Sequence, residues 1–274
     1  MERMVKFRSE HPCKKINIAG VQWGYIACGV GTRTLLLLLT GAMRLAETAF
    51  YWIQMFEDSY RLIAPTYPPL WTMDEITDGI MNILDAEKVQ TAYALGQSYG
   101  GWMAQVLVRR YPSRFRKLVL SSSGPLTATK TERVLLGPII TLLQVIPEGL
   151  LKWMLRRAVL SDLPATGSER DFLRAYTEEI LTRLGKPDLL SHFRAARDAV
   201  NKKYTFAEGE KSDWDGELLM IGGKDDRFVS EEDRKRILEI YPQAQFHVFA
   251  RGGHDVFLVE QSEYRTAVKE FLDK

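Results

Sequence analysis

The chain has 274 residues, 46% hydrophobic and 26% charged, which is enough for one large domain with a buried core. Its 37 lysines and arginines nearly balance 35 acidic residues, and a net charge of +2 argues against nucleic acid or an anionic membrane as partner. The two cysteines, Cys13 and Cys28, predict free thiols rather than a disulfide framework. The sequence shows no apolar signal segment, and the five leucines at 35–39 are too few to span a bilayer. We therefore expect a cytoplasmic protein with no membrane span.

The first 125 residues predict strands followed by alternating helices and strands. Residues 14–19 and 21–28 predict a hairpin at the edge of a sheet. The run TLLLLL at 34–39 is apolar without alternation, as in a parallel strand covered on both faces. This order favours an α/β fold with a mostly parallel sheet flanked by helices. Further strands are expected at 60–64, 92–95 and 117–120, and helices at 46–57, 73–86 and 99–110.

The pattern changes in residues 126–212, where only helix-like segments occur. Helices are predicted at 131–145, 149–160, 168–184 and 188–203, and the first two are strongly apolar. The sheet pattern then resumes with strands at 217–221 and 244–249 and helices at 231–240 and 261–272. We therefore expect a core domain of residues 1–125 and 213–274 with a helical cap, 126–212, inserted into it. The alternative is that these four helices are ordinary core helices.

A G-x-S-x-G pattern, Gly96-Gln97-Ser98-Tyr99-Gly100, separates a predicted strand from a predicted helix. In that context the pattern is typical of a nucleophile elbow, a sharp turn that exposes the serine at the edge of a sheet. Glycines are needed there because the chain packs tightly on both sides of the turn. Ser98 is therefore the candidate nucleophile.

Two later strands also end in groups with useful chemistry. Asp225 and Asp226 follow the strand at 217–221, and His254 follows the last strand in a glycine-rich loop. Because the carboxyl ends of parallel strands share one edge of a sheet, these groups are expected near Ser98. Ser98 would attack an acyl carbon, His254 would accept its proton, and a carboxylate would orient the imidazole. Asp226 is preferred as the acid, while Asp225 is expected to hydrogen-bond the loop backbone.

The other histidines have weaker positions. His11 is expected in a polar tail, His192 on a solvated face of the cap, and His247 in strand packing. An oxyanion hole is expected from the backbone N–H groups of Tyr99 and of Ala42, with Met43 as the alternative to Ala42. The sequence has no metal-ligand spacing and no phosphate-binding loop, so neither a metal nor a cofactor is predicted.

The motifs GQSYGG, GGKDDRFV and GGHDVF together resemble the α/β-hydrolase superfamily over nearly the whole chain. That family usually has His-Gly where this chain has Thr40-Gly41. Residues 60–71 and 83–89, with the elbow, are also similar to the maspardin subgroup, whose members are associated with protein binding. The acid and histidine positions of that subgroup are degraded, whereas this chain keeps Asp226 and His254.

The resemblance and the three motif residues predict a serine hydrolase that cleaves carboxylic esters of small to medium acyl chains. Its partner would be a small-molecule ester held in a greasy pocket under the apolar cap helices. The same groups could instead cleave a C–C bond, an amide or a lactone. A non-catalytic binding module of the maspardin type is the alternative from another class, because fold alone does not decide function. Enzymes with an aspartate nucleophile are disfavoured by Ser98.

Overall fold

The computed structural model describes residues 1–38, 43–161, 166–201 and 204–274. Within them, one sheet has the strand order β1-β2-β4-β3-β5-β6-β7-β8. β1 and β2 form an antiparallel hairpin at one edge, β2 also pairs antiparallel with β4, and the strands from β4 to β8 are parallel. The predicted α/β architecture with a mostly parallel sheet is therefore confirmed. The strands are β1 Lys14–Ile18, β2 Val21–Cys28, β3 Thr34–Leu38, β4 Arg61–Thr66, β5 Ala92–Gln97, β6 Phe115–Ser121, β7 Glu217–Gly223 and β8 Gln245–Phe249.

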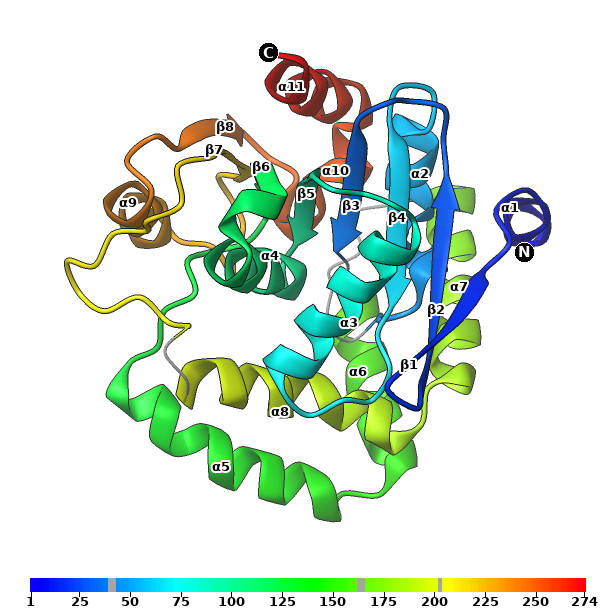
Figure 1. Ribbon diagram of the computed structural model, residues 1–274. Helices are drawn as coiled ribbons and strands as arrows, with labels where there is room; N and C mark the ends of the chain where they lie inside the picture. The colour runs from blue at the N-terminus through cyan, green and yellow to red at the C-terminus, as the bar shows by residue number, and fades with distance from the viewer. Residues whose placement is uncertain (39–42, 162–165, 202–203) are drawn as a thin grey trace.

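Helices cover both faces of this sheet (Figure 1). In that view α3 and α4 lie in front of the central strands. α2, α10 and α11 form a second group of helices that pack against one another. The indole of Trp52 on α2 stacks on Phe257 of α10, with ring centroids 4.0 Å apart, and donates to Tyr264 of α11. These helices are α2 Phe50–Phe56, α3 Met73–Ala86, α4 Tyr99–Arg110, α9 Glu231–Ile240, α10 Val256–Val259 and α11 Gln261–Asp273.

Strand β3 lies inside the sheet, between β4 and β5, and each of its five residues is buried. Its uninterrupted leucines are therefore covered on both faces, as the absence of alternation predicted. Two helix starts also follow from local sequence. Ser230 caps α9 by accepting from the backbone N–H of Asp233, whose carboxylate binds back to Ser230, and the Thr72–Glu75 pair does the same for α3.

The N-terminal segment differs from the prediction of a polar tail. Residues Glu2–Glu10 form helix α1, in which Met4 and Phe7 are buried. Arg3 of this helix forms an ion pair with Glu169, at 2.9 Å. Two apolar residues three apart are too short a pattern to predict a helix, and the helix is stabilised by contacts distant in sequence.

Four helices lie between β6 and β7 and form a helical insertion at the end of the sheet to which β3 points (Figure 1). Their positions agree with the four helices expected there. A buried arginine of the core, Arg44, holds the insertion in place. Its guanidinium donates to the carbonyl oxygens of Tyr67, Pro68 and Asp188, at 2.8, 2.5 and 2.6 Å, and to the hydroxyl of Ser191, at 3.0 Å. The insertion consists of α5 Lys130–Val145, α6 Glu148–Ser161, α7 Gly167–Arg183 and α8 Lys186–Asn201.

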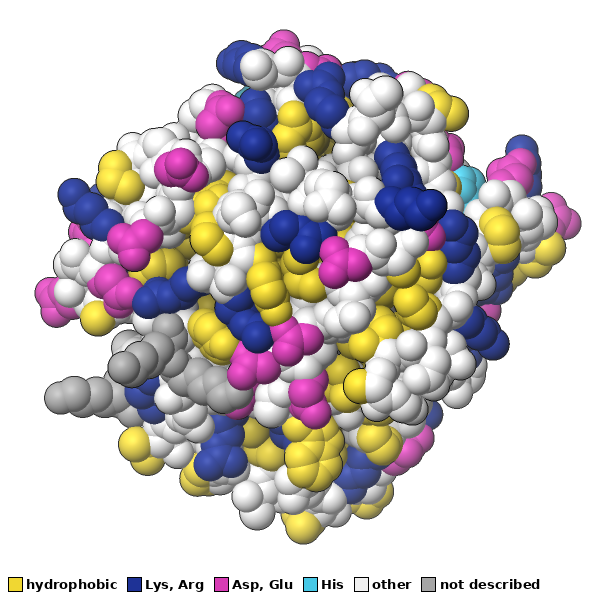
Figure 2. Space-filling model, viewed as in Figure 1, with side chains coloured by type: hydrophobic (Ala, Val, Ile, Leu, Met, Phe, Trp, Pro, Cys, Tyr) yellow, Lys and Arg dark blue, Asp and Glu magenta, His cyan; other side chains and the backbone are white. Residues whose placement is uncertain are grey.

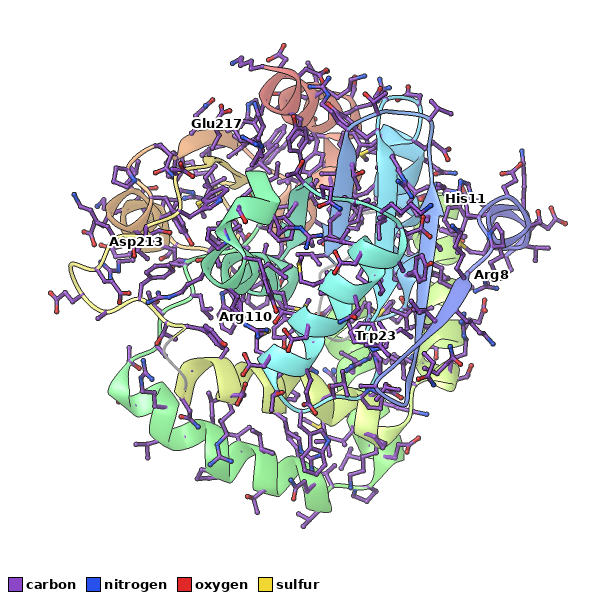
Figure 3. All side chains as sticks on the ribbon, in the orientation of Figure 1. Arg8, His11, Trp23, Arg110, Asp213 and Glu217 are labelled. Atoms are coloured by element: carbon purple, nitrogen blue, oxygen red, sulfur yellow. The ribbon has the colours of Figure 1, made fainter. Side chains whose placement is uncertain are left out.

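The contact between α3 and the sheet depends on a glycine. Trp23 of β2 is buried against α3, and a Cβ atom at Gly79 would lie 1.9 Å from its Cζ2 atom (Figure 3). Arg110 of α4, also labelled there, forms an ion pair with Asp78 of α3, at 2.7 Å. The helix therefore approaches the indole as closely as a residue without a side chain allows.

We expect Gly79→Ala to lower the free energy of unfolding by about 1–3 kcal/mol, because the rigid indole cannot move aside without disturbing its neighbours. Gly149→Ala is the matched control, since it also replaces a helical glycine but meets no atom within 4 Å. That control is expected to be neutral or to stabilise the protein by up to about 1 kcal/mol. Urea denaturation followed by circular dichroism measures both, and equal effects would contradict the packing argument.

Candidate active site

Ser98 occupies a strained turn between β5 and α4. Its backbone has φ 53° and ψ −120°, in a region that residues with a side chain rarely adopt. The N–H of Ser98 donates to the carbonyl of Ser121 at 3.0 Å, and its own carbonyl accepts from Gly101 N–H at 2.9 Å. A Cβ atom at Gly96 would lie 2.4 Å from the carbonyl oxygen of Gly100. The turn thus has the geometry and the glycine requirement that the G-x-S-x-G pattern predicted.

The two aspartates after β7 take different partners. A carboxylate oxygen of Asp226 lies 3.0 Å from Nδ1 of His254, and the Asp226 side chain is fully buried. Its other oxygen accepts from the N–H of Phe228 at 2.8 Å. Asp225 instead accepts from the N–H of Gly253, at 2.8 Å. The imidazole therefore contacts Asp226, and Asp225 binds the histidine loop through its backbone.

Ser98 and His254 line one cavity of about 450 Å³. Most of its wall is aromatic or aliphatic, and among the described residues that line it there is no lysine or arginine. α6 and α7 of the insertion contribute to this wall together with α2 of the core. Such a mainly apolar cavity with a few convergent polar groups is the usual form of a small-molecule site. Its lining includes Met43, Phe50, Tyr51, Trp52, Ala158, Leu173, Tyr176, Thr177, Phe228 and Phe257.

Of the three residues expected to supply oxyanion donors, the structure describes Tyr99 and Met43. Tyr99 is the first residue of α4, so its N–H belongs to the helix N-terminus, where the backbone dipoles favour negative charge. Met43 lines the cavity with Ser98 and His254. Ala42 and the Thr40-Gly41 pair lie outside the described residues.

Two residues that the sequence did not single out hold the histidine. The side-chain amide of Gln97 donates to the carbonyl oxygen of His254 at 3.1 Å. The ring of Phe228 packs edge-on against the imidazole, with centroids 4.9 Å apart. Gln97 directly precedes the candidate nucleophile, so its position in the motif is the one signal that could have found it. Phe228 follows Asp226 by two residues, but nothing in the sequence shows which way its ring points.

His192 is not on a solvated face, and that prediction is wrong. Its ring lies 6.1 Å from Tyr99 and 3.8 Å from Phe193, between centroids, and its Nδ1 atom is buried. Burial, with a smaller contribution from the charge of Arg44, lowers the pKa of His192 to about 4. Nearby charged residues in the sequence suggested exposure, but the imidazole faces the inside of the insertion. His247 lies in β8 and pairs with Glu263 at 3.1 Å.

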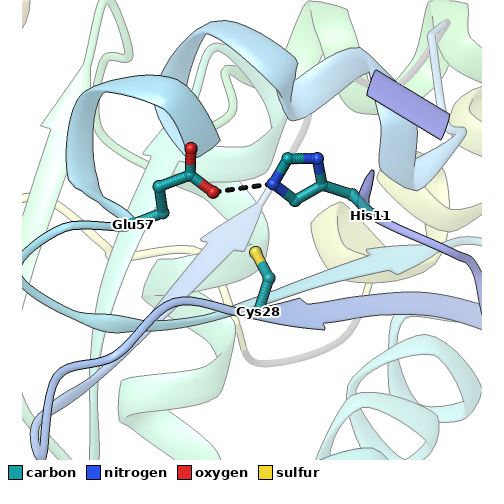
Figure 4. Close-up of side chains that lie close together, drawn as sticks. All are labelled: His11, Cys28 and Glu57. Atoms are coloured by element: carbon teal, nitrogen blue, oxygen red, sulfur yellow. Dashed lines mark hydrogen bonds and ion pairs between the residues drawn. The ribbon is translucent and has the colours of Figure 1, made fainter. Parts of the chain in front are cut away.

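His11, Cys28 and Glu57 come together at the edge of the sheet (Figure 4). Their potential ligand atoms lie within 4.8 Å of one another. His11 Nε2 is 2.6 Å from a Glu57 oxygen, and its Nδ1 is 3.0 Å from the carbonyl of Phe7. Burial raises the pKa of Cys28 to about 12, so its thiol stays protonated at neutral pH and is a poor metal ligand. The histidine–carboxylate pair accounts for this cluster without a metal.

A family model described as the alpha/beta hydrolase fold matches residues 55–261. The chain belongs to the α/β-hydrolase family. The chain is 30% identical to a 2-hydroxy-6-oxononadienedioate/2-hydroxy-6-oxononatrienedioate hydrolase of Burkholderia vietnamiensis. The match covers 70% of this chain and 66% of that relative, just under two-thirds of its length.

Solved structures also share the fold of this chain. A hydrolase from Pseudomonas aeruginosa PA01 superposes with a TM-score of 0.76 at 17% identity, covering 96% of this chain and 99% of that one. An esterase from Exiguobacterium antarcticum gives a TM-score of 0.75 at 16% identity, covering 95% and 99%. The superfamily resemblance is thereby confirmed, while the narrower maspardin resemblance stays a prediction.

The buried imidazole of His192 predicts a pH dependence of stability. Its pKa is about 4 in the folded protein and near 6.5 in the unfolded chain, so between these values the unfolded chain binds the extra proton. The free energy of unfolding should therefore decrease as the pH falls from 6.5 to about 4. His192→Phe should remove up to about 3 kcal/mol of this decrease.

Urea denaturation across this pH range measures the effect. His247→Gln is the control, because His247 is partly exposed and pairs with Glu263 near the surface, and it should keep the wild-type slope. An unchanged slope in His192→Phe would show that the imidazole is hydrated in the folded protein.

Proposed function

We propose that the hydrolase cleaves uncharged carboxylic esters through an acyl-enzyme on Ser98. The observation that carries the proposal is that Ser98 and His254 face the same apolar cavity while Asp226 binds the far nitrogen of the imidazole. A buried carboxylate at Nδ1 fixes the tautomer in which Nε2 can accept a proton. The helical insertion acts as the cap over this cavity.

The chemistry assigns one role to each residue. Ser98 attacks the acyl carbon as His254 takes the hydroxyl proton, and the imidazolium then gives that proton to the leaving alcohol. Water repeats the sequence to release the acid. Tyr99 N–H, together with Ala42 or Met43, stabilises the negative charge on the carbonyl oxygen. Gln97 and Phe228 are positioning residues for the imidazole.

The cavity wall favours an uncharged substrate. A dienedioate, the substrate named for the Burkholderia vietnamiensis relative, carries two carboxylates that would need cationic or other strong donors. The described lining residues offer aromatic rings, Thr177 and the carboxylate of Asp255, but no lysine or arginine. An ester with an apolar acyl group fits these surroundings better than a dianion does.

Cleavage of a C–C bond is the second candidate, favoured by the 30% identity to that relative. The two candidates differ in substrate rather than in the serine and histidine required. Parallel assays with p-nitrophenyl butyrate and with a 2-hydroxy-6-oxo-dienoate separate them. Faster turnover of the dienoate would replace the ester proposal.

Ser98→Ala is expected to abolish both p-nitrophenyl ester hydrolysis and covalent labelling by a fluorophosphonate. The reason is that the hydroxyl of Ser98 is the one that His254 activates in the proposed mechanism. Intact mass spectrometry should find one adduct on the wild type, weakened in His254→Ala. A well-folded wild type without an adduct would favour the non-catalytic binding module. Normal ester hydrolysis by Ser98→Ala would refute the assignment of Ser98 as the nucleophile.

Asp226→Asn is expected to lower kcat by about 10³- to 10⁴-fold, since the amide favours the wrong imidazole tautomer. Asp225→Asn is the matched control, because Asp225 contacts the histidine loop only through Gly253 N–H. Its kcat should stay within about tenfold of the wild type, the scale of one lost hydrogen bond. Equal losses in the two variants would refute the assignment of the acid.

A further inference from the structure

The helical insertion carries an exposed apolar face that the ester-hydrolase proposal does not use. Single exposed apolar residues are normal, but a contiguous group marks an interaction surface. Figure 2 shows hydrophobic side chains along the lower edge of the molecule, where Figure 1 places α5. The α5–α6 apolar face consists of Val134, Leu135, Ile139, Leu142 and Val145 on α5, with Leu150, Trp153 and Met154 on α6.

The α5 helix is apolar on both its sides. Val134, Leu142 and Val145 are 71%, 60% and 73% exposed, while Ile140 on the inner side is buried. The sequence contains no charged residue from 134 to 147. A surface helix normally presents charged residues to water, and a helix that is apolar all round is normally covered on every side. The outer side of α5 therefore has the composition of a buried surface.

The composition also indicates what covers it. Among the described residues, no single helix is long and apolar enough to cross a bilayer. Segments Arg133–Val145 and Glu148–Ser161 reach the length and composition of a span only together, and a bend of 120° separates them. Such a bent pair can lie along the surface of a lipid layer with its apolar side inserted.

The edge of the face suits the boundary between lipid and water. Trp153 is exposed, and the guanidinium of Arg157 lies 5.4 Å from the centroid of its ring. Tryptophan is enriched at this boundary, and long cationic side chains reach from it to the headgroups. Nearby, Lys152 pairs with Glu148 at 2.8 Å and Arg156 pairs with Glu178. Because these acids offset the cations, attraction comes mainly from apolar area.

α6 also lines the cavity of the candidate nucleophile. Ala158 and Val159 of α6 form part of the catalytic cavity. Ala158 also lines a second cavity, of about 250 Å³, between α5, α6 and α8, whose wall is apolar apart from His192. α6 therefore borders both cavities, α5 borders the second one through Leu143, and Met154 of the α5–α6 apolar face also lines the second cavity.

We propose that the α5–α6 apolar face docks the hydrolase onto a lipid surface, from which an ester with an apolar acyl chain enters the cavity of Ser98. Docking rests on the exposed face alone, whereas delivery of the ester rests on the proposed function. A second copy of the chain could also cover an apolar face, and the experiment distinguishes that copy from a lipid surface.

The test is flotation of the full chain with phosphatidylcholine vesicles. The wild type should float, and Leu142→Glu/Val145→Glu should reduce the floated fraction about tenfold or more, because carboxylates do not enter apolar lipid. Val5→Glu/Val30→Glu is the matched control, since these valines are 65% and 82% exposed but lie in α1 and in the loop after β2. It should float like the wild type.

Hydrolysis of soluble p-nitrophenyl butyrate is measured in parallel and should be the same in all three proteins. Flotation without hydrolysis would keep the docking surface and remove the ester-hydrolase proposal. Hydrolysis without flotation, or equal flotation of Leu142→Glu/Val145→Glu, would overturn the docking surface. A concentration-dependent dimer that this variant abolishes, with no flotation, would assign the face to a second copy instead.

Discussion

The close approach of backbone to backbone around Ser98 is the constraint on which the rest of the site depends. Gly96 lets β5 pass against the start of α4, and a Cβ atom at Gly101 would lie only 2.2 Å from the hydroxyl of Ser123. With these atoms absent, α4 starts directly at the end of the strand and stays buried against β5 and β6. The strain at Ser98 is tolerated because the turn is fixed from both sides.

Parallel pairing extends this local constraint to residues far away in sequence. β5, β6, β7 and β8 run in the same direction, so the loops after them open at one edge of the sheet. Ser98 and Asp226 are 128 positions apart in number, and His254 follows after 28 more. The sheet, rather than any local motif, brings these loops to one edge, where Ser98 and His254 line one cavity together with residues of α6 and α7.

The sequence predicted those features that local pattern and chain direction determine. The glycines around Ser98, the leucines of β3 and the four helices of the insertion each carry a periodic or turn signal, and each lies where it was expected. The choice of Asp226 over Asp225 agrees with the contact to His254 because the turn chemistry distinguishes the two positions.

The sequence could not predict features that depend on which side of a helix or strand is buried. α1 is a helix because Met4 and Phe7 meet a surface formed by distant residues. His192 is only partly exposed, with its Nδ1 atom buried, although charged residues surround it in sequence, because its ring faces the cavity between α5, α6 and α8. The size of the cavity depends on how four helices pack, and no pattern in a single chain gives that volume.

The buried guanidinium of Arg44 has a consequence for how the folded chain opens. It joins the carbonyls of Tyr67 and Pro68 in the core to Asp188 and Ser191 at the start of α8. Separating α8 from the core would take two of the four hydrogen-bond acceptors from this charge, so α8 belongs to the same cooperative unit as the sheet. Arg133 on α5 donates to the carbonyl of Val200, near the end of α8, and to the hydroxyl of Thr205 at 2.7 Å. α5 is thus joined to α8 rather than to the sheet, and its backbone amides should exchange with solvent through smaller openings than those of α8.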